Sequence, residues 1–510
     1  KFFIKHNKAE LHKMAVSKGI MLYPLNNVED IMGDAQLKAR NSLAKVEHPD
    51  LGNSITYPGA FAKFSETPIS IGRPPRIGEH NEEVFKELAA GEKSPAGAGK
   101  TSKPAEAGKR VFEGLKVVEF TWVVAGPWVG KYLAENGAEV VRIETGPRPD
   151  LFRFAAPYKD DIPGPDRAPM AAIFNNDKNG ITLNLRHPKG LEVAKKLIAR
   201  ADVLVENYTP GTLPRLGLGY DVLKEINPGL IMLSSSNQGQ TGPYASQIGF
   251  GYQLSSFVGY HNITGWPDRD PCLIRTPYTD LPGARYGLIS VLAALDYRRR
   301  TGKGQFIDLS QYEAGLQFLA SIVLDYDVNK RVARRDGNRD PYAAPHGAYP
   351  CQGDDRWCAI GVFSEEEWQS FCKVIGDPSW TKDAKFTNLA ARKENEEELD
   401  RLVGEWSSGH TAEEVMSMMQ KAGVPAGVVQ TCADLHADPQ LKHRNHFMQI
   451  EHPVIGKHFY FNEGFRLSKT PGEPTNPGPC IGEHNEYVYT KILGMSDEEF
   501  IGMLTDGVFK

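Results

Sequence analysis

The stretch Leu115-Lys-Val-Val-Glu-Phe-Thr-Trp-Val-Val-Ala-Gly-Pro-Trp128 opens the pattern that decides the fold. Its first six residues predict a short apolar strand, and Pro127 suits the first turn of a following helix. That helix is expected to run to about Asn136-Gly137, because glycine commonly ends helices. Residues 138–144 (A-E-V-V-R-I-E) predict a second strand. A strand, a helix and a strand in this order form a βαβ unit, so we expect a doubly wound parallel sheet of the α/β class.

The alternation of strands and helices continues along the chain. Apolar runs predict strands at 181–185, 202–207, 230–236 and 304–309, and Pro188 begins an amphipathic helix between the first two. No G-x-G-x-x-G motif follows the first strand, so a nicotinamide dinucleotide site is not predicted. The turns after parallel strands still offer helix N-termini to a phosphate group.

The pattern changes after about residue 330. Residues 357–363 predict a strand, and Ser364-Glu-Glu-Glu367 and Thr411-Ala-Glu-Glu414 are capping boxes that predict helix starts. We therefore expect a large α/β domain at 114–330, a smaller α+β domain at 331–426, and a segment at 427–510 that packs back elsewhere.

Asp280 lies at a hinge within Ile274–Leu295. After it, apolar residues at 284, 288, 291, 292 and 295 have helical spacing, so Asp280 is expected at or near a helix start. One interpretation is an N-cap, since an aspartate side chain accepts hydrogen bonds from free backbone N–H groups. The other is a carboxylate nucleophile that the helix dipole keeps ionised. The pattern alone leaves both open.

Composition excludes several classes of function. The 510 residues suffice for several domains, and the net charge of −5 does not suggest a nucleic-acid partner. The longest apolar runs fall short of the roughly 18 residues that a membrane span needs. The six cysteines form no C-x-x-C pair, so no metal site is predicted, and free thiols in the cytoplasm are expected.

Two segments near the ends of the chain repeat each other without gaps. Asp34-Ala-Gln-Leu-Lys-Ala-Arg-Asn41 matches Asp438-Pro-Gln-Leu-Lys-His-Arg-Asn445, 404 residues later. Glu47-His-Pro49 matches Glu451-His-Pro453, and 77–82 matches 481–486, at the same offset. We interpret residues 1–88 as a second copy of the C-terminal segment.

Residues 89–113 are rich in Ala, Gly, Lys, Ser and Pro, a composition that predicts a flexible linker. The expected natural protein is a tandem of two related units. This chain would then hold the tail of the first unit, the linker, and the whole second unit. Partial duplication of a wrapping segment is the alternative.

Several ordered blocks of sequence resemble one known family. They are G-L-K-V-V-E-F-T-W-V-V-A-G-P at 114–127, G-A-E-V-V-R-I-E at 137–144, N-x-x-K-x-G-I-T-L-N-L-R at 175–186, the run at 201–220, and Q-G-Q-T-G-P-Y at 238–244. Together they resemble the family III CoA-transferases, from about Gly114 to the C-terminus. Formyl-CoA, carnitine and succinyl-CoA:benzylsuccinate transferases belong to this family.

The resemblance implies a Rossmann-like large domain, a small domain, and a tail that returns to the large domain. It also implies two interlocked subunits. Here the partner would be a second copy of the chain, or a first unit or partner subunit in a pseudo-dimer. The family's nucleophile is an aspartate at a helix start, and Asp280 occupies its position. Ala284 stands where the family usually has glycine.

The implied activity moves CoA from an acyl-CoA to a carboxylic acid through an aspartyl anhydride and an aspartyl-CoA thioester. CoA is then a substrate, and no permanently bound cofactor is expected. The family's CoA-binding positions fall on Val124, Ala125, Leu183, Arg186, Asn207, Tyr208 and Arg215. Val124 and Thr145 differ from the Gln and Arg of formyl-CoA transferase. The absent tetraglycine lid argues against an oxalate and formate pair.

Two other functions stay open. An α-methylacyl-CoA racemase shares this fold and the aspartate, but its second proton-transfer residue, a histidine, aligns with Phe250; His261 is nearby and out of register. A non-catalytic subunit of a heteromeric transferase is the other. The acid pair is not predicted, although aromatic residues such as Trp122 and Phe250 would suit a bulky acyl group.

Overall fold

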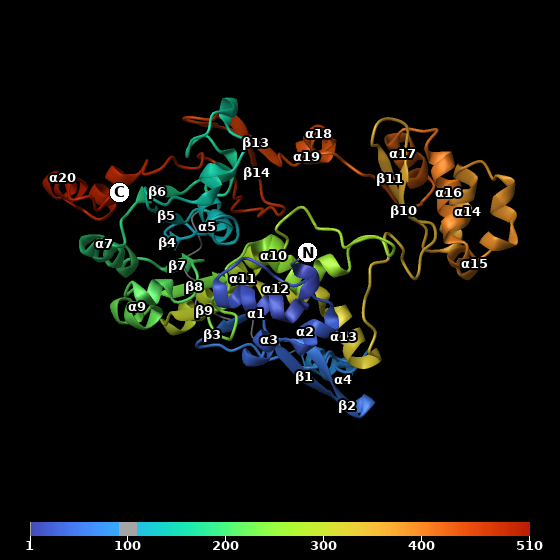
Figure 1. Cartoon of the computed structure of the whole chain (residues 1–510), viewed down its shortest axis with the longest axis horizontal. Helices are drawn as coiled ribbons and strands as arrows, with labels where there is room; N and C mark the ends of the chain where they lie inside the picture. Colours follow the sequence, from blue (N-terminus) through green and yellow to red (C-terminus); the bar gives the residue numbers. More distant parts are fainter. Residues whose placement is uncertain (1, 91–109) are drawn as a thin grey trace. The chain divides into compact units, whose positions relative to one another are not determined.

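The structure is a computed structural model that describes residues 2–90 and 110–510 (Figure 1). Most of the linker expected at 89–113 lies outside these residues. Contacts divide the chain into two units. Unit 1 comprises Lys1–Ile263, Leu273–Ala333 and Asn445–Lys510, and unit 2 comprises Thr264–Cys272 and Arg334–Arg444.

A seven-stranded sheet forms the centre of unit 1. Its order is β3-β9-β8-β7-β4-β5-β6, and all neighbours are parallel except β3, which runs antiparallel to β9. The six parallel strands have the order of a doubly wound dinucleotide-binding sheet. The predicted α/β fold is therefore confirmed as a mixed seven-stranded sheet. The strands are β3 (Ala62–Phe64), β4 (Lys116–Phe120), β5 (Glu139–Glu144), β6 (Asn179–Thr182), β7 (Val203–Glu206), β8 (Ile231–Ser236) and β9 (Gln305–Ser310).

Helices cover both faces of this sheet (Figure 1). Val117 and Val118 are both buried but belong to different apolar clusters, because neighbouring strand residues point to opposite faces. One face packs on α7 (Pro188–Ala199) and α9 (Tyr220–Ile226), and the other on α5 (Ala125–Glu135) and α11 (Asp280–Thr301). Burial on both faces explains why neighbouring residues such as Val203, Leu204 and Val205 of β7 are all apolar and buried rather than alternating with polar residues.

Two predicted elements have different bounds. The strand expected at 181–185 ends at Thr182, because the backbone of Asn184 instead donates to Val508 of the C-terminal tail. The helix expected from Ser310 is interrupted by a 3-10 turn at Gln317–Leu319. Other elements of unit 1 are α1 (Lys8–Lys18), α2 (Val28–Gly33), α3 (Ala35–Ala39), β1 (Leu43–His48), β2 (Asn53–Pro58), α4 (Asn81–Ala89), α6 (Pro169–Ile173), α8 (Thr212–Arg215), α10 (Gly251–Val258), α12 (Gln311–Leu316), α13 (Ala320–Asn329), β13 (Phe447–His452), β14 (Gly456–Phe461) and α20 (Asp497–Thr505).

Unit 2 is a three-stranded antiparallel sheet with helices. It also includes Thr264–Cys272 and the two short helices before Asn445, which lie outside the small domain expected at 331–426. An ion pair of 2.7 Å between Arg356 and Asp434 ties the first of these helices to the unit. Its elements are β10 (His346–Pro350), β11 (Trp357–Gly361), α14 (Glu365–Val374), α15 (Leu389–Glu394), α16 (Glu396–Ser407), α17 (Ala412–Lys421), β12 (Ala426–Val428), α18 (Cys432–Ala437) and α19 (Pro439–His443).

The sequence repeat is also a structural repeat. Helices α2 and α3 and strand β1 have counterparts in α18, α19 and β13, each displaced by 404 residues. Asn41 follows α3 and Asn445 follows α19, and both residues have a positive φ, of 52° and 50°. The N-terminal copy belongs to unit 1 and packs on the rest of it. The β1–β2 hairpin and α2 contact α13, and β3 extends the central sheet. Among the described helices, none is long and apolar enough to cross a membrane.

Candidate active site

A cavity of about 340 Å³ opens at the carboxyl ends of the central strands. It lies where β4 and β7 adjoin, the point at which the strand order reverses, and ligands of doubly wound sheets bind at this point. The lining residues come from the loops after β4, β5, β7 and β8, from the two helix starts at Asp280 and Gln311, and from the N-terminal copy. They are Met21, Trp122–Ala125, Arg148, Leu151, Asn207–Pro210, Ser235–Asn237, Ala245, Gln247–Phe250, Asp280 and Gln311.

Asp280 is the first residue of α11, and Thr279 occupies the N-cap position without a side-chain cap. The N-cap interpretation of Asp280 is therefore wrong, because its side chain turns into the cavity instead of back onto the helix. Asp280 as a whole residue is only 6% exposed. Gly251 permits its position, since a Cβ there would lie 2.9 Å from the Asp280 Cγ.

Burial raises the pKa of Asp280 to about 7, because a charged carboxylate loses hydration in the cavity wall. The Gln311 side chain hydrogen-bonds the carboxylate and lowers the pKa in part. Gln311 is the first residue of α12 and is itself buried. A Cβ on Gly283 would lie 3.0 Å from Gln311 Cγ, so that glycine leaves space for the contact.

Four polar atoms in the cavity wall are buried and have no hydrogen-bond partner among the described residues. They are the hydroxyls of Ser235 and Ser236, the Gln311 Oε1, and the Trp122 Nε1. Buried polar groups are normally paired, so an unpaired set beside a buried carboxylate is suited to a polar ligand. Among the described residues no group of His, Cys, Asp and Glu is placed to hold a metal ion.

The model of CoA-transferase family III matches residues 1–81 and 112–485. The chain belongs to this family.

Individual relatives agree with the family. The succinyl-CoA–D-citramalate CoA-transferase of Chloroflexus aurantiacus is 34% identical over 390 residues, 76% of this chain and 96% of that protein. A probable CoA-transferase of Mycobacterium tuberculosis is 30% identical over 407 residues, 78% of this chain but 50% of that protein. A CAIB/BAIF family protein from Brucella suis has a TM-score of 0.69 and 31% identity, covering 75% of this chain and 100% of that one.

Four of the seven expected CoA-binding residues line the cavity together with Asp280: Val124, Ala125, Asn207 and Tyr208. The Asn207 side chain accepts a hydrogen bond of 2.8 Å from the Trp122 backbone and so holds the loop after β4. The other three, Leu183, Arg186 and Arg215, are not among the lining residues. Leu183 is fully buried in the core, whereas both arginines are exposed.

Several lining residues were missed by sequence reasoning. Arg148, three residues after Thr145, places its guanidinium 5.2 Å from the Trp122 ring. Ser235 and Ser236 end a buried strand, and that polar ending was an available signal. Met21 had no local signal, because it reaches the cavity only through the docking of the N-terminal copy.

The racemase alternative lacks its second base in this cavity. Phe250, the aligned position, lines the cavity and carries no titratable group. His261 is buried outside the lining residues, where its Nδ1 lies 2.7 Å from the Ser256 hydroxyl. Asp280 therefore has no histidine beside it among the lining residues.

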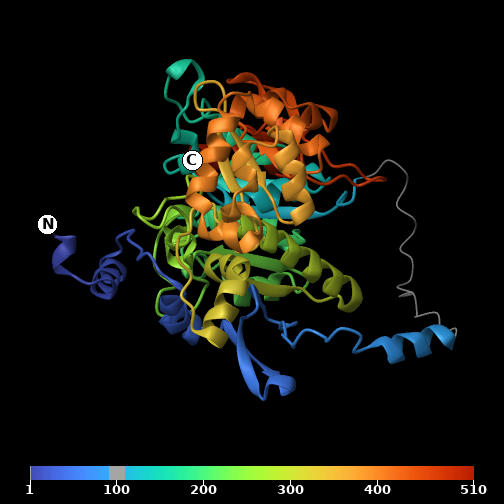
Figure 2. The same cartoon turned by 90° about the vertical axis from the view of Figure 1, so that its right-hand side faces the viewer.

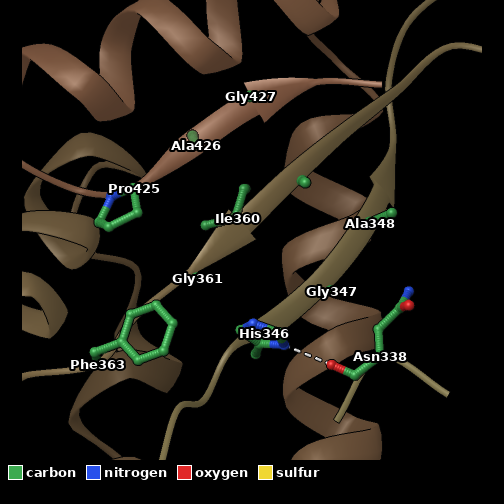
Figure 3. Close-up of a pocket in the computed structure, with 11 residues that line it drawn as sticks. Asn338, His346, Gly347, Ala348, Ile360, Gly361, Phe363, Pro425, Ala426 and Gly427 are labelled. Carbon is green, nitrogen blue, oxygen red and sulfur yellow. Dashed lines mark hydrogen bonds between the residues drawn. The ribbon is translucent and has the colours of Figure 1, made fainter. Parts of the chain in front are cut away.

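A second cavity, of about 350 Å³, lies in unit 2 (Figure 3). It is lined mostly by small and apolar residues, including Gly347 of β10, Ile360 of β11 and Pro425, which directly precedes β12. His346 hydrogen-bonds the Asn338 carbonyl there at 2.5 Å. None of its lining residues is a carboxylate or a thiol, so the candidate nucleophile lies in the first cavity.

Proposed function

We propose that this protein transfers CoA from an acyl-CoA to a carboxylic acid, with Asp280 as the nucleophile. The observation that supports this proposal is the buried Asp280 carboxylate in a cavity at the switch point of a CoA-transferase fold. A carboxylate nucleophile conserves the energy of the thioester, provided that water is excluded. Burial of Asp280 favours that exclusion.

The first half of the reaction loads CoA onto the protein. An Asp280 oxygen attacks the thioester carbonyl, the carbon–sulfur bond breaks, and CoA leaves as a thiolate. The thiolate then attacks the aspartyl carbon of the mixed anhydride. The bond to the donor acyl group breaks, the donor acid leaves as a carboxylate, and an aspartyl-CoA thioester remains.

The second half reverses these steps with the acceptor acid. Its carboxylate attacks the aspartyl-CoA carbonyl and displaces CoA thiolate, which gives a new anhydride. The thiolate attacks the acceptor carbonyl, and Asp280 leaves as a carboxylate. Charge and protons balance over the cycle, so a second acid–base residue is not required.

We further propose that the Gln311 side chain donates to one oxygen of Asp280, which stays a carbonyl in the anhydride and in the thioester, while the other oxygen attacks the substrate. When thiolate or acceptor adds to the aspartyl carbon, negative charge develops on the held oxygen. A fixed donor at that oxygen stabilises this charge, as in an oxyanion hole.

We propose a short acyl-CoA donor whose acyl group ends in a second carboxylate. The unpaired hydroxyls of Ser235 and Ser236 could donate to that carboxylate. The name of the Chloroflexus relative includes such a donor, succinyl-CoA. The proposal specifies the acyl-CoA donor and leaves the identity of the acceptor acid open to the assay below.

CoA itself is proposed to lie along the loops after β4 and β7. Val124, Ala125, Asn207 and Tyr208 would contact it within the cavity. Arg148, at the cavity wall, is suited to a phosphate as a charge-assisted donor. Leu183, Arg186 and Arg215 remain proposed contacts for the nucleotide end outside the cavity.

A transfer assay tests the proposal. The protein is incubated with succinyl-CoA and a panel of free acids, and new CoA thioesters are measured by mass spectrometry. Transfer to at least one acid, lost in Asp280→Asn and retained in Asp296→Asn, is expected, because Asp296 is an exposed residue of the same helix. Transfer that survives Asp280→Asn would contradict the nucleophile role.

A further inference from the structure

Val123, in the wall of the cavity that contains Asp280, has an unusual backbone conformation. Its φ is 68°, in the left-handed region. Nine of the described residues other than glycine have a positive φ, and seven of these are Asn or Asp, whose short polar side chains tolerate the region. A β-branched valine does not, because its side chain crowds the backbone there. The conformation of Val123 is therefore strained, and other residues must hold it.

The turn that contains Val123 is short and tightly packed. Strand β4 ends at Phe120 and α5 begins at Ala125. A Cβ on Gly126 would lie 2.8 Å from the Thr121 Cγ2 and 2.9 Å from the Asn207 Cγ. Tight turns of this kind usually have glycine at the left-handed position, but here the residue is Val123.

Asp150 holds the backbone amide of Val123. The Val123 N–H donates to both carboxylate oxygens of Asp150, at 3.1 and 3.0 Å. Asp150 follows β5, which pairs in parallel with β4, and both strands belong to the cyan part of the chain in Figure 2. The loops after these strands therefore leave the same edge of the sheet. A hydrogen bond to a charged acceptor is roughly twice as strong as a neutral one, so this contact can offset strain in the turn.

The Asp150 carboxylate is itself fixed in place. The Arg142 guanidinium binds it at 2.6 Å, and the Phe152 backbone N–H donates to it at 2.9 Å. The Asp150 backbone N–H in turn donates to Glu144 at 3.1 Å. Asp150 and Arg142 are 0% and 1% exposed, so water does not compete for these contacts. The carboxylate is thus a rigid support for the neighbouring turn.

The residue before Val123 is held from the other side of the turn. The Trp122 N–H donates to the Asn207 side chain at 2.8 Å, and the Trp122 carbonyl accepts from the same side chain at 2.9 Å. Residues 122–125 all line the cavity, whereas Asp150 is not among the lining residues. Asp150 therefore acts on the cavity only through the residues that it holds.

We propose that Asp150 is a positioning residue of the CoA site. Its carboxylate holds Val123 in the left-handed conformation and thereby places Val124 and Ala125 for contact with CoA. This role rests on the proposed position of CoA along the loop after β4. Glycine would adopt the same φ without strain but would leave no side chain in the cavity wall. Valine supplies that side chain, and Asp150 offsets its strain.

Without the Asp150 carboxylate, Val123 should take a negative φ in most molecules. The binding-competent turn is then expected in about one molecule in ten to one in a hundred. The apparent affinity for CoA falls by the same factor, because CoA binds only the competent turn. A saturating acyl-CoA restores that turn, so KM should rise while kcat changes much less.

A double-mutant cycle with free CoA as the ligand tests the role of Asp150. Calorimetry measures CoA binding to the wild type, Asp150→Asn, Val123→Gly and the double variant. Asp150→Asn is expected to weaken binding about 10–100-fold in the wild-type background, but less than about threefold in the Val123→Gly background. Arg142 keeps Glu119 and Glu144 at 3.6 and 3.4 Å, so its buried charge is still paired. An equal loss in both backgrounds would overturn the proposal, because Asp150 would then be a structural ion-pair partner only.

Lys330→Gly is the matched control for rescue by glycine. Lys330 also has a positive φ, 57°, but it is an exposed residue at the end of α13 and is not among the residues that line the cavity. Glycine relieves strain there without touching the turn, so Lys330→Gly should not restore CoA binding to Asp150→Asn. Restoration would overturn the proposal, since general stabilisation would then explain the rescue.

Hydrogen exchange of the peptide that contains Val123 provides a readout without CoA. The Val123 amide should exchange slowly in the wild type and fast in Asp150→Asn, because the variant no longer holds the turn. Equally fast exchange in both proteins would overturn the proposal. A wild type that binds no CoA would contradict the proposed CoA site itself, whereas equal losses in the cycle would contradict only the role of Asp150.

The comparison also covers a failure of Asp150→Asn to fold. The double variant with Val123→Gly is then expected to fold, because glycine removes the strain that Asp150 offsets. If the double variant also fails to fold, the proposal is overturned, since the loss of the contact with Arg142 would explain both results.

Discussion

Arg40 of the N-terminal segment forms a buried ion pair with Glu313, 273 residues later, with 2.5 Å between Nε and Oε1. Glu313 stands two residues after Gln311, which holds the Asp280 carboxylate. The same segment places Met21 in the cavity wall. The N-terminal copy is thus part of the construction of the site, although it precedes the large domain in sequence.

Gln36→Ala should destabilise the chain far more than Gln440→Ala. The buried Gln36 makes three hydrogen bonds to the loop at 238–244, and each is worth about 0.5–1.5 kcal/mol, so a loss of about 2–4 kcal/mol is expected. Gln440 is its exposed counterpart, and its truncation should cost less than about 0.5 kcal/mol. Urea unfolding of both variants measures the difference. Equal effects would contradict the docked position of α3.

Gln311→Ala should lower kcat by about 10²–10³-fold, the usual cost of losing one oxyanion donor. It should also raise the apparent pKa of the pH–rate profile, because the hydrogen bond from Gln311 favours the ionised Asp280. Gln317→Ala is the matched control, since Gln317 instead binds the carbonyls of Gly59 and Glu313. An unchanged pH–rate profile in Gln311→Ala would show that Gln311 does not act on the Asp280 carboxylate and has only a structural role.

The pKa of Asp280 couples activity and stability to pH. Because the folded pKa is about 7 and the ordinary value is 3.8, the folded state holds this proton more tightly than the unfolded state. Ionisation therefore destabilises the fold as pH rises from about 4 to 7, by roughly 4 kcal/mol at 1.36 kcal/mol per pKa unit. The rate of CoA transfer should rise as the pH approaches and passes about 7, because the ionised carboxylate of Asp280 is the nucleophile.

Asp280→Asn removes this titration and provides the measurement. Its free energy of unfolding, relative to the wild type, should increase by a few kcal/mol between pH 4 and pH 8. Chemical denaturation at several pH values tests this. A stability difference that does not depend on pH would show that Asp280 does not titrate with a raised pKa.

The protein should not exchange the α-proton of a 2-methylacyl-CoA. Racemisation needs two proton-transfer groups, whereas Phe250 lines the cavity and His261 lies outside it. Incubation in D2O followed by mass spectrometry of the thioester measures the exchange. Incorporation of deuterium at the α-position would favour the racemase.

Much of the large domain could be predicted from local sequence patterns. The βαβ unit at 115–144 and the capping boxes at Ser364 and Thr411 depend on neighbouring residues, and each formed as predicted. Asp280 was predicted at the helix start from the spacing of apolar residues. Patterns of this kind carry their information within one or two turns of chain.

The contacts that complete the site are long-range and left little local signal. Met21 lines the cavity because the N-terminal segment is docked there. Gln36 and Arg40 of that segment donate hydrogen bonds to the loop at 238–242, more than 200 residues later in the sequence. The sequence pattern places Ser235 at a strand end and Gln311 at a helix start. Their position beside Asp280, however, depends on the order of the strands in the sheet. Leu183 was placed by the resemblance, yet the tail that packs on β6 buries it in the core.

Trapping of the covalent intermediate tests the central claim most directly. The protein is incubated with succinyl-CoA and hydroxylamine, and the peptide that contains Asp280 is analysed by mass spectrometry. A hydroxamate on Asp280 that requires succinyl-CoA, and that is absent from Asp280→Ala together with transfer activity, is the predicted result. Continued transfer without any adduct on that peptide, or transfer retained in Asp280→Ala, would contradict the account.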